Sequence, residues 1–331
     1  MKNKLNLFIN GKYWEEEYIK NFLFQNFQIN KFDDYEKFKQ AQEENKIFIY
    51  TNGQKKINIS LLNELKNSSS DLIFTLSDDL YTNKKYYNNF RIIFRNYFFP
   101  KLASNNVYTL PLGFGNVYVN SEKKFDFTNK EYMWSFIGRG DDYRKSVIDK
   151  FIHIEPYILE LNDKFLDIES RDINLQKEKI SKSFFLLCPG SYNPESFRIM
   201  EALELGTLPI LISQFNSEYF KYIYGDHPLI IINKWSDISL KVTKLIEDPE
   251  LLKDKLLETE EWYSKFKNNL LHDIETIVLN KNTPLKSEQF AFQRKAKFNL
   301  ISRFMYFKFF RYNLEKLRFK SRVIGKLKSL I

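Results

Sequence analysis

The chain has 331 residues, which is enough for two ordinary hydrophobic cores, and aromatic residues make up 17% of it. Its single cysteine, Cys188, excludes an internal disulfide and any cysteine-based metal cluster. No window reaches the roughly 20 apolar residues that span a bilayer, and the first ten residues are too polar for a signal peptide, so we expect a cytoplasmic protein.

The first part of the chain predicts an α/β domain over residues 1–120. Short apolar runs alternate there with clusters of turn residues, the pattern expected of strands in such a domain. The expected strands are 5–9, 46–50, 71–76 and 107–110. We also predict an aromatic helix from Asn83 to Phe99, which Pro100 would end.

Two acidic residues, Asp78 and Asp79, follow the third of these strands. The carboxyl ends of strands in α/β sheets face the ligand crevice, so one of the pair is a candidate for a catalytic base. The alternative is that an aspartate caps the following helix. A histidine base from this domain is not expected, because His153, His227 and His272 all lie further along the chain.

A second α/β domain is predicted over residues 121–280, with the crossing between the domains near 115–131. It begins with a strand over 132–137, and a helix over 143–153 follows the glycine loop that starts at Gly138. A glycine loop between the first strand and the first helix of an α/β domain faces the ligand crevice. We interpret Asp141 and Asp142 as helix-start acids and not as metal ligands.

The segment 184–212 carries the strongest signal, because it predicts a strand, a helix and a second strand within 29 residues. The apolar run Phe184–Leu187 ends at Cys188-Pro189-Gly190. Asn193 and Pro194 indicate a helix start, with the helix over 194–205 and Gly206 just past its end. The strand Leu208–Ile212 completes a βαβ unit, whose first loop meets a helix N-terminus as in phosphate-binding sites.

Three charged residues, Glu195, Arg198 and Glu201, recur at intervals of three along that helix. This spacing predicts that they lie near one helical face. The arginine can form a fork to a diphosphate, and the deeper carboxylate can accept both hydroxyls of a ribose. A surface ladder of salt bridges is the alternative. The position between a Pro-Gly loop and a buried strand favours a binding site.

A strongly basic tail occupies residues 281–331. Its last 46 residues, 286–331, hold 13 Lys and Arg against two acids, whereas the whole chain has a net charge of +9. Aromatic residues alternate with these cations, which favours a helix on an anionic membrane surface and would place the protein at the inner face of the membrane. The alternatives are packing across the N-terminal domain and nucleic-acid binding. Nucleic acid is not the expected partner, because no recognised binding motif accompanies the charge.

The segment 184–212 resembles the nucleotide-sugar motif of exostosin-like glycosyltransferases, a GT-B family. In that motif an apolar strand ends in Cys-Pro, a Gly/Ser loop follows, and an acidic-Ser-x-Arg-x-x-Glu-Ala-Leu-x-x-Gly helix leads to a Pro-containing strand. The residues that match are Cys188, Pro189, Gly190, Ser196, Arg198, Glu201, Ala202, Leu203, Gly206 and Pro209. Gly190 stands where the family has an arginine, and Glu195 stands where it has an aspartate.

This resemblance implies two Rossmann-like domains that face a cleft and an inverting transfer from a nucleotide diphosphate sugar, most simply a UDP-sugar, to a glycan or lipid-linked acceptor. It implies no required cofactor and no metal, because arginines and helix dipoles neutralise the diphosphate in such enzymes. Arg198 would hold the pyrophosphate and Glu201 the ribose. The donor-binding set is Gly138, Arg139, Arg144, Gly190, Ser191, Glu195, Ser196, Arg198 and Glu201.

Two other functions remain open on the sequence. A GDP-fucose-type transferase has a similar helix motif, but it expects a lysine that is missing from Glu195-Ser-Phe-Arg198. A catalytically inactive GT-B scaffold, recruited to a membrane by the basic tail, belongs to another class. The presence of Arg198 and Glu201 argues against the scaffold.

Overall fold

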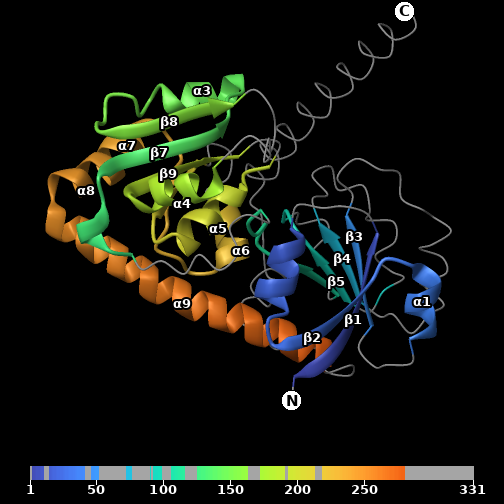
Figure 1. Ribbon diagram of the computed structural model, residues 1–331. Coiled ribbons are helices and arrows are strands. Elements are labelled where there is room, and N and C mark those ends of the chain that lie inside the picture. The colour runs from blue at the N-terminus through green and yellow to red at the C-terminus, as the bar shows by residue number, and fades with distance from the viewer. Residues whose placement is uncertain are drawn as a thin grey trace, which may run out of the picture.

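The computed structural model describes most of the chain and shows two groups of strands joined by a long helix (Figure 1). The residues that it describes are 2–10, 15–41, 46–51, 72–76, 90, 92–98, 106–115, 125–162, 172–190, 193–212 and 218–279. Asp78, Asp79, Ser191 and the tail 281–331 lie outside these residues.

The N-terminal group is a six-stranded sheet in the order β2-β1-β3-β4-β5-β6, and every neighbouring pair runs parallel. The four strands predicted from the sequence all occur in it. The bounds are β1 Asn3–Asn10, β2 Phe27–Phe32, β3 Lys46–Thr51, β4 Leu72–Leu76, β5 Ile92–Arg95 and β6 Val107–Thr109. Parallel strands need crossover connections, and a π-helix η1 (Tyr18–Leu23) and a short α1 (Tyr35–Gln40) lie in two of them.

The predicted aromatic helix from Asn83 to Phe99 is wrong in its second half, where the structure has strand β5. The sequence Ile92-Ile-Phe-Arg95 is buried at all four positions. A strand buried on both faces shows a continuous apolar run without alternation, so periodicity does not separate it from a buried helix. The chain then bends at Tyr97, which has a positive φ of 59°.

The second group is a five-stranded sheet in the order β11-β10-β9-β7-β8, again parallel throughout. Its strands are β7 Tyr132–Arg139, β8 Tyr157–Asn162, β9 Ser183–Pro189, β10 Leu208–Ile212 and β11 Ile230–Ile232. The two central strands, β9 and β10, are buried along their whole length. The predicted strands 132–137, 184–187 and 208–212 are therefore confirmed, and two of them are longer than expected.

Helices connect these strands and pack on the second sheet. They are α3 Asp142–Ile148, α4 Ile173–Ser181, α5 Phe197–Glu204, α6 Tyr219–Tyr224, α7 Ser236–Ile238, the π-helix η6 Ser239–Thr243, and α8 Lys244–Glu247; a short 3-10 helix, η5 Phe127–Asn129, precedes the sheet. The predicted helix over 143–153 is shorter than expected, since α3 ends at Ile148 and turns follow.

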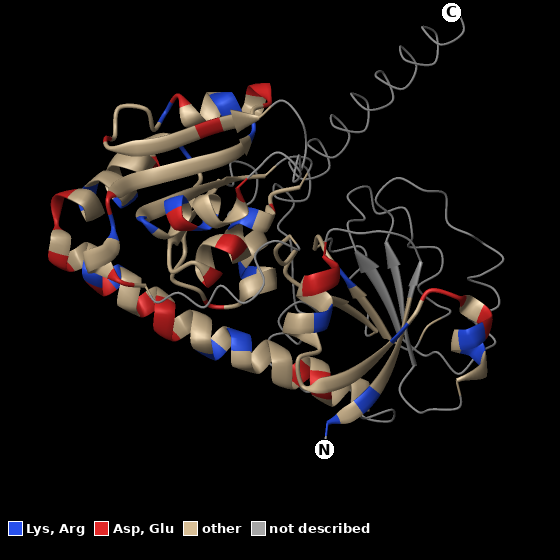
Figure 2. Ribbon diagram, in the orientation of Figure 1, with Lys and Arg blue, Asp and Glu red and all other residues tan. Residues whose placement is uncertain are grey.

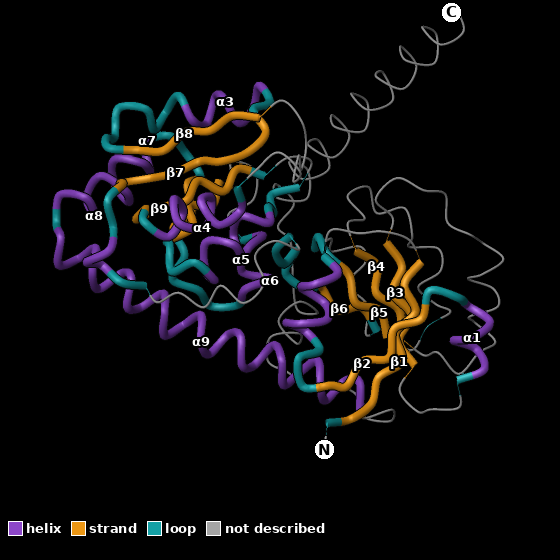
Figure 3. Tube along the Cα trace, viewed as in Figure 1, coloured by secondary structure: helices purple, strands orange, loops and turns teal. Residues whose placement is uncertain are grey.

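The last described helix, α9 (Pro249–Leu279), is 31 residues or about 46 Å long and runs alongside both groups of strands (Figures 1 and 3). Its Lys267 ammonium lies 5.1 Å from the ring centroid of Phe22 in η1, and its Glu275 accepts a 3.1 Å hydrogen bond from Asn26. Tyr263 of the same helix donates a hydrogen bond to Glu204 of α5, so one helix contacts both groups.

Charged side chains lie mainly on helices and loops, and the strands of the second sheet carry few of them (Figure 2). Within that sheet they are Arg139 and Glu160.

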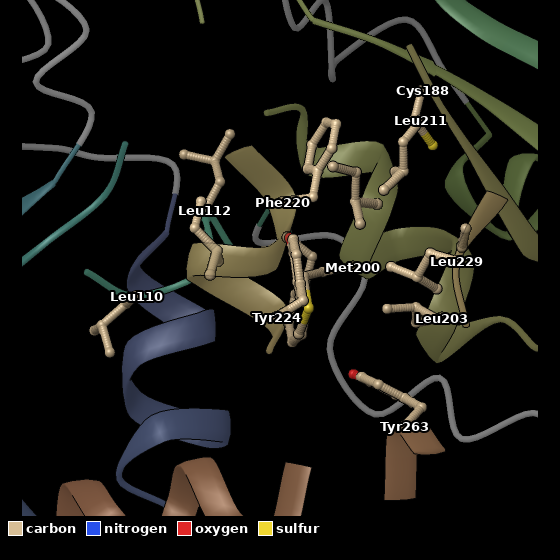
Figure 4. Packing of buried hydrophobic residues seen from close by; sticks show 14 of the residues in the cluster. Leu110, Leu112, Cys188, Met200, Leu203, Leu211, Phe220, Tyr224, Leu229 and Tyr263 are labelled. Atoms are coloured by element: carbon tan, nitrogen blue, oxygen red, sulfur yellow. The ribbon is translucent and has the colours of Figure 1, made fainter. Parts of the chain in front are cut away.

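Buried apolar residues from both groups form a continuous cluster, in which Leu112 of the N-terminal group lies against the helix that carries Tyr224 (Figure 4). None of the described helices is long and apolar enough to span a membrane.

Candidate functional site

In the second sheet, the order in which the chain adds strands reverses between β7 and β9. The chain passes from β7 to β8 on one side and then returns to place β9 on the other side of β7. In open parallel sheets the crevice at such a switch point, outside the carboxyl ends of the strands, is where ligands bind. Gly138 lies near the end of β7, and Gly190 follows β9 directly.

Helix α5 begins beside this switch point, three residues later than predicted. Ser196, not Asn193, is its N-cap and accepts a 3.4 Å hydrogen bond from the Arg198 backbone N–H. The reason is that residues 193–194 fold back over Gly190, where an added Cβ would lie 2.2 Å from the Asn193 carbonyl oxygen. The predicted helix end is confirmed, because Gly206 has a φ of 66° directly after the helix.

The Arg198 side chain crosses the switch point from α5 to β7. Its Nε and Nη2 donate hydrogen bonds of 3.1 and 2.6 Å to the Ile137 carbonyl oxygen, and its Cζ lies 4.9 Å from the centroid of the Phe136 ring. A Cβ at Gly138 would lie 1.7 Å from Nη2. Residue 138 must therefore be glycine if the guanidinium is to reach this position.

A second arginine, Arg144 in α3, lies close enough for its charge to interact with that of Arg198. It is buried, its Nη1 donates a 3.3 Å hydrogen bond to the Arg139 carbonyl oxygen, and Asp141 is its acidic neighbour at 3.7 Å from Nε. Within the described residues, Nε is buried without a hydrogen-bond partner. Burial, together with the charges of Arg198 and Arg139, lowers the pKa of Arg144 to about 10.

The acidic pair Asp141-Asp142 lies at the start of α3. The Asp141 carboxylate accepts a 3.0 Å hydrogen bond from the Arg144 backbone N–H and so caps the helix, while Asp142 occupies the first turn. The interpretation of this pair as helix-start acids is confirmed. In the described part of the chain, no group of three or more His, Cys, Asp or Glu residues could hold a metal ion.

Glu201 lies one turn deeper in α5 than Arg198 and is 9% exposed. Burial raises its pKa to about 7, against the opposing effects of the Arg198 charge and of a hydrogen bond from the Gly115 backbone N–H. A carboxylate in this position has further lone pairs with which to accept hydroxyl groups. The donor Gly115 belongs to the segment that follows β6, in the N-terminal group.

Glu195 does not share a helical face with Arg198 and Glu201, so that prediction is wrong for this residue. It precedes the helix, and its carboxylate accepts hydrogen bonds of 3.0 Å from the Leu112 N–H and 3.3 Å from the Tyr219 hydroxyl. The Tyr224 hydroxyl and the Tyr97 backbone N–H are further donors. Burial raises the pKa of Glu195 to about 7 in spite of these four donors.

The structure thus brings Gly138, Arg144, Arg198 and Glu201 together at the switch point, whereas Glu195 joins the two groups of strands. Arg139 is exposed at the end of β7, and its carbonyl oxygen accepts the hydrogen bond from Arg144. Sequence reasoning missed the backbone donors of residues 97, 112 and 115. The available signal was the pair of glycines in Pro111-Leu-Gly-Phe-Gly115, directly after the carboxyl end of a strand.

Solved structures with a similar fold include a phage glucosyltransferase. The complex of T4 phage BGT with its UDP-glucose substrate is 12% identical, with a TM-score of 0.50, and the match covers 85% of this chain and 100% of that one. A mutant of T4 phage BGT in complex with UDP-glucose is also 12% identical, with a TM-score of 0.51 and coverage of 84% and 99%. The α/β fold with parallel sheets therefore resembles that of GT-B glycosyltransferases.

No curated protein matches the chain in sequence. The family model described as RXYLT1 C-terminal domain matches residues 117–282, which is half of the chain and includes every strand of the second sheet. The chain therefore belongs to the RXYLT1 C-terminal domain family and is an exostosin-like glycosyltransferase of the GT-B type.

Proposed function

We propose that the chain transfers a sugar from a UDP-sugar to a glycan or lipid-linked acceptor, with inversion at the anomeric carbon. The observation that carries the proposal is the pair of arginines, Arg144 and Arg198, at the switch point of the second sheet. Within the described residues, Asp141 and Glu201 are acidic neighbours of these arginines, and the buried Nε of Arg144 lacks a hydrogen-bond partner. Such a site is suited to an anion.

In this proposal the diphosphate of the donor lies against Arg198 and Arg144, at the N-terminus of α5. Charge develops on the diphosphate as the bond to the sugar breaks, and fixed cations in a site with little water stabilise that charge. Glu201 then accepts the ribose hydroxyls, one helical turn deeper. The arginines and the helix dipole supply the positive charge, so we propose no metal requirement.

The acceptor hydroxyl has to lose a proton as it attacks the anomeric carbon. We propose that Asp78 or Asp79, which follow β4 of the N-terminal group, accepts this proton across a cleft between domains 1–120 and 121–280. Direct attack on the face opposite the leaving diphosphate would invert the configuration. The UDP preference is supported by the T4 phage relative, which binds UDP-glucose. Membrane contact through residues 286–331 and a cytoplasmic location remain predictions from the sequence.

Calorimetric titration with UDP, GDP and CMP tests the donor site. We expect UDP to bind, and Arg198→Ala and Glu201→Ala to weaken binding by about 30-fold or more, because each removes a charged partner from a buried site. Lys145→Ala is the matched control: it removes a positive charge from an exposed position of α3 next to Arg144.

Each result has a defined meaning. Equal losses in Arg198→Ala and Lys145→Ala would show that only net charge matters and would refute the assigned site. A preference for GDP would favour the fucosyltransferase type. The absence of binding to every nucleotide would refute the enzyme as proposed, and binding of the tail to anionic vesicles would then test the scaffold alternative.

A further inference from the structure

The segment after β6, residues 110–115, connects the two groups of strands through its backbone. The Leu112 N–H donates a 3.0 Å hydrogen bond to Glu195 Oε1, and the Gly115 N–H donates to the carboxylate of Glu201. These two glutamates stand immediately before and within α5. The connecting segment 110–115 therefore contacts Glu195, three residues before Arg198, and Glu201, three residues after it.

The connecting segment 110–115 is held in place by the N-terminal group. Gly113 has a φ of 83°, and a Cβ there would lie 2.4 Å from the Tyr18 ring. The next residue, Phe114, has its ring centroid 5.1 Å from that of Tyr18 and 5.7 Å from that of Phe22, both in edge-on contact. Tyr18 and Phe22 belong to η1, so the N-terminal group fixes where the Gly115 N–H points.

We propose that the Gly115 backbone N–H is a positioning group of the donor site, which orients the Glu201 carboxylate for the ribose of the nucleotide. This inference rests on the proposed function. A carboxylate has about four lone-pair sites, so one backbone hydrogen bond leaves room for both hydroxyls of a ribose. The nucleotide site in the family domain, residues 117–282, is then completed by a residue just outside it.

The same hydrogen bond favours the charged form of Glu201, whose pKa is about 7. Burial raises the pKa of Glu201, and the Gly115 N–H and Arg198 lower it. Cys188 of β9 is a further titratable neighbour, and its thiol has its own pKa raised by burial. Loss of the N–H would therefore leave a larger fraction of Glu201 protonated near neutral pH, and a protonated carboxyl group accepts fewer hydroxyl hydrogen bonds.

Two substitutions at one position separate the N–H from the rest of the residue. Gly115→Pro removes the donor, whereas Gly115→Ala retains it, and the added Cβ meets nothing within 4 Å. We expect UDP to bind about tenfold or more weakly to Gly115→Pro than to Gly115→Ala at pH 7. The pH midpoint of binding should also rise by about one unit in Gly115→Pro. Thermal unfolding establishes that both variants are folded.

Selective labelling of the intact wild-type protein provides a second measurement that does not depend on the proline variant. The chain has only 10 glycines, so a ¹⁵N-glycine spectrum is simple, and the Gly115 resonance is the one lost in Gly115→Ala. We expect this resonance to titrate with a midpoint near pH 7, to lose that titration in Glu201→Gln, and to shift when UDP is added.

The outcomes for this inference and for the proposed function differ. If the wild type binds no nucleotide, the proposed function fails, and the positioning role fails with it. If the wild type binds UDP but Gly115→Pro and Gly115→Ala bind equally well, or if the Gly115 resonance does not respond to pH, only the positioning role is overturned.

Discussion

Replacement of Gly138 by alanine should move the Arg198 side chain away from its site without deleting it. The new Cβ would lie 1.7 Å from Arg198 Nη2 and 2.7 Å from Cζ. Carbon and nitrogen atoms need about 3.5 Å, so the guanidinium has to retreat by roughly 2 Å, which breaks its 2.6 Å hydrogen bond to the Ile137 carbonyl oxygen.

The free energy of unfolding should fall by about 1–2.5 kcal/mol, and no more, because Arg198 is half-buried and can turn to solvent. A charge-assisted hydrogen bond contributes about 1.5–3 kcal/mol, and the stiffer unfolded chain of an alanine variant offsets about 0.5 kcal/mol of this. Nucleotide binding should lose about 2 kcal/mol, a factor of about 30, since the arginine no longer faces the diphosphate.

Calorimetry with UDP and thermal unfolding measure the two effects on the same samples. Gly140→Ala is the control, because its Cβ would approach side-chain carbons of Leu161 and Lys145 no closer than 3.2 Å. If folded Gly138→Ala binds UDP as tightly as Gly140→Ala, Arg198 does not hold the diphosphate, and our reasoning about the switch point is wrong.

Three further substitutions each test one buried contact. Gly113→Ala should destabilise the fold by about 2 kcal/mol or more, measured by urea unfolding, because the residue has a positive φ and its Cβ would overlap the Tyr18 ring. The folded-state pKa of Glu195 is raised to about 7, so its contribution to stability is full below about pH 4.5 and is lost as the pH rises to 7. Glu195→Gln should remove about 3 kcal/mol of this pH dependence of the free energy of unfolding. An unchanged pH profile would contradict the assignment. Tyr263→Phe should cost about 1–3 kcal/mol, because it removes the 2.5 Å hydrogen bond to the buried Glu204; a loss below about 0.5 kcal/mol in urea unfolding would show that Lys267 suffices alone.

The second sheet could be predicted well from the sequence because its signals are local. The apolar run of β9, the glycine after α5 and the strand Leu208–Ile212 follow one another within 29 residues, each bounded by turn residues. Arg198 was identified as a candidate from its place in this pattern. Its partner, the Ile137 carbonyl, lies 61 residues away and could not be inferred from spacing.

The predicted start of α5 and the predicted position of Glu195 were wrong because packing contacts that local periodicity does not show determine both. The start of α5 moved to Ser196 because residues 193–194 pack on Gly190, a contact that outweighs a good local N-cap signal. Glu195 was grouped with its neighbours in sequence, yet its donors come from segments before β6, after β6 and from α6. Leu112 and Glu195 are 83 residues apart in the chain. No local periodicity predicts which buried carboxylate faces which segment.

The long helix α9 has a consequence for how this chain folds as it is made. Asn26 and Glu275, which are hydrogen-bonded in the structure, are separated by 249 residues. At roughly 5–20 residues per second, a ribosome adds α9 about 12–50 s after it has made η1. During that interval the aromatic surface around Phe22 lacks its Lys267 neighbour. The contact between η1 and α9 is therefore formed last, although η1 is synthesised early, and a chain stalled before α9 would present that surface to chaperones or to other nascent chains.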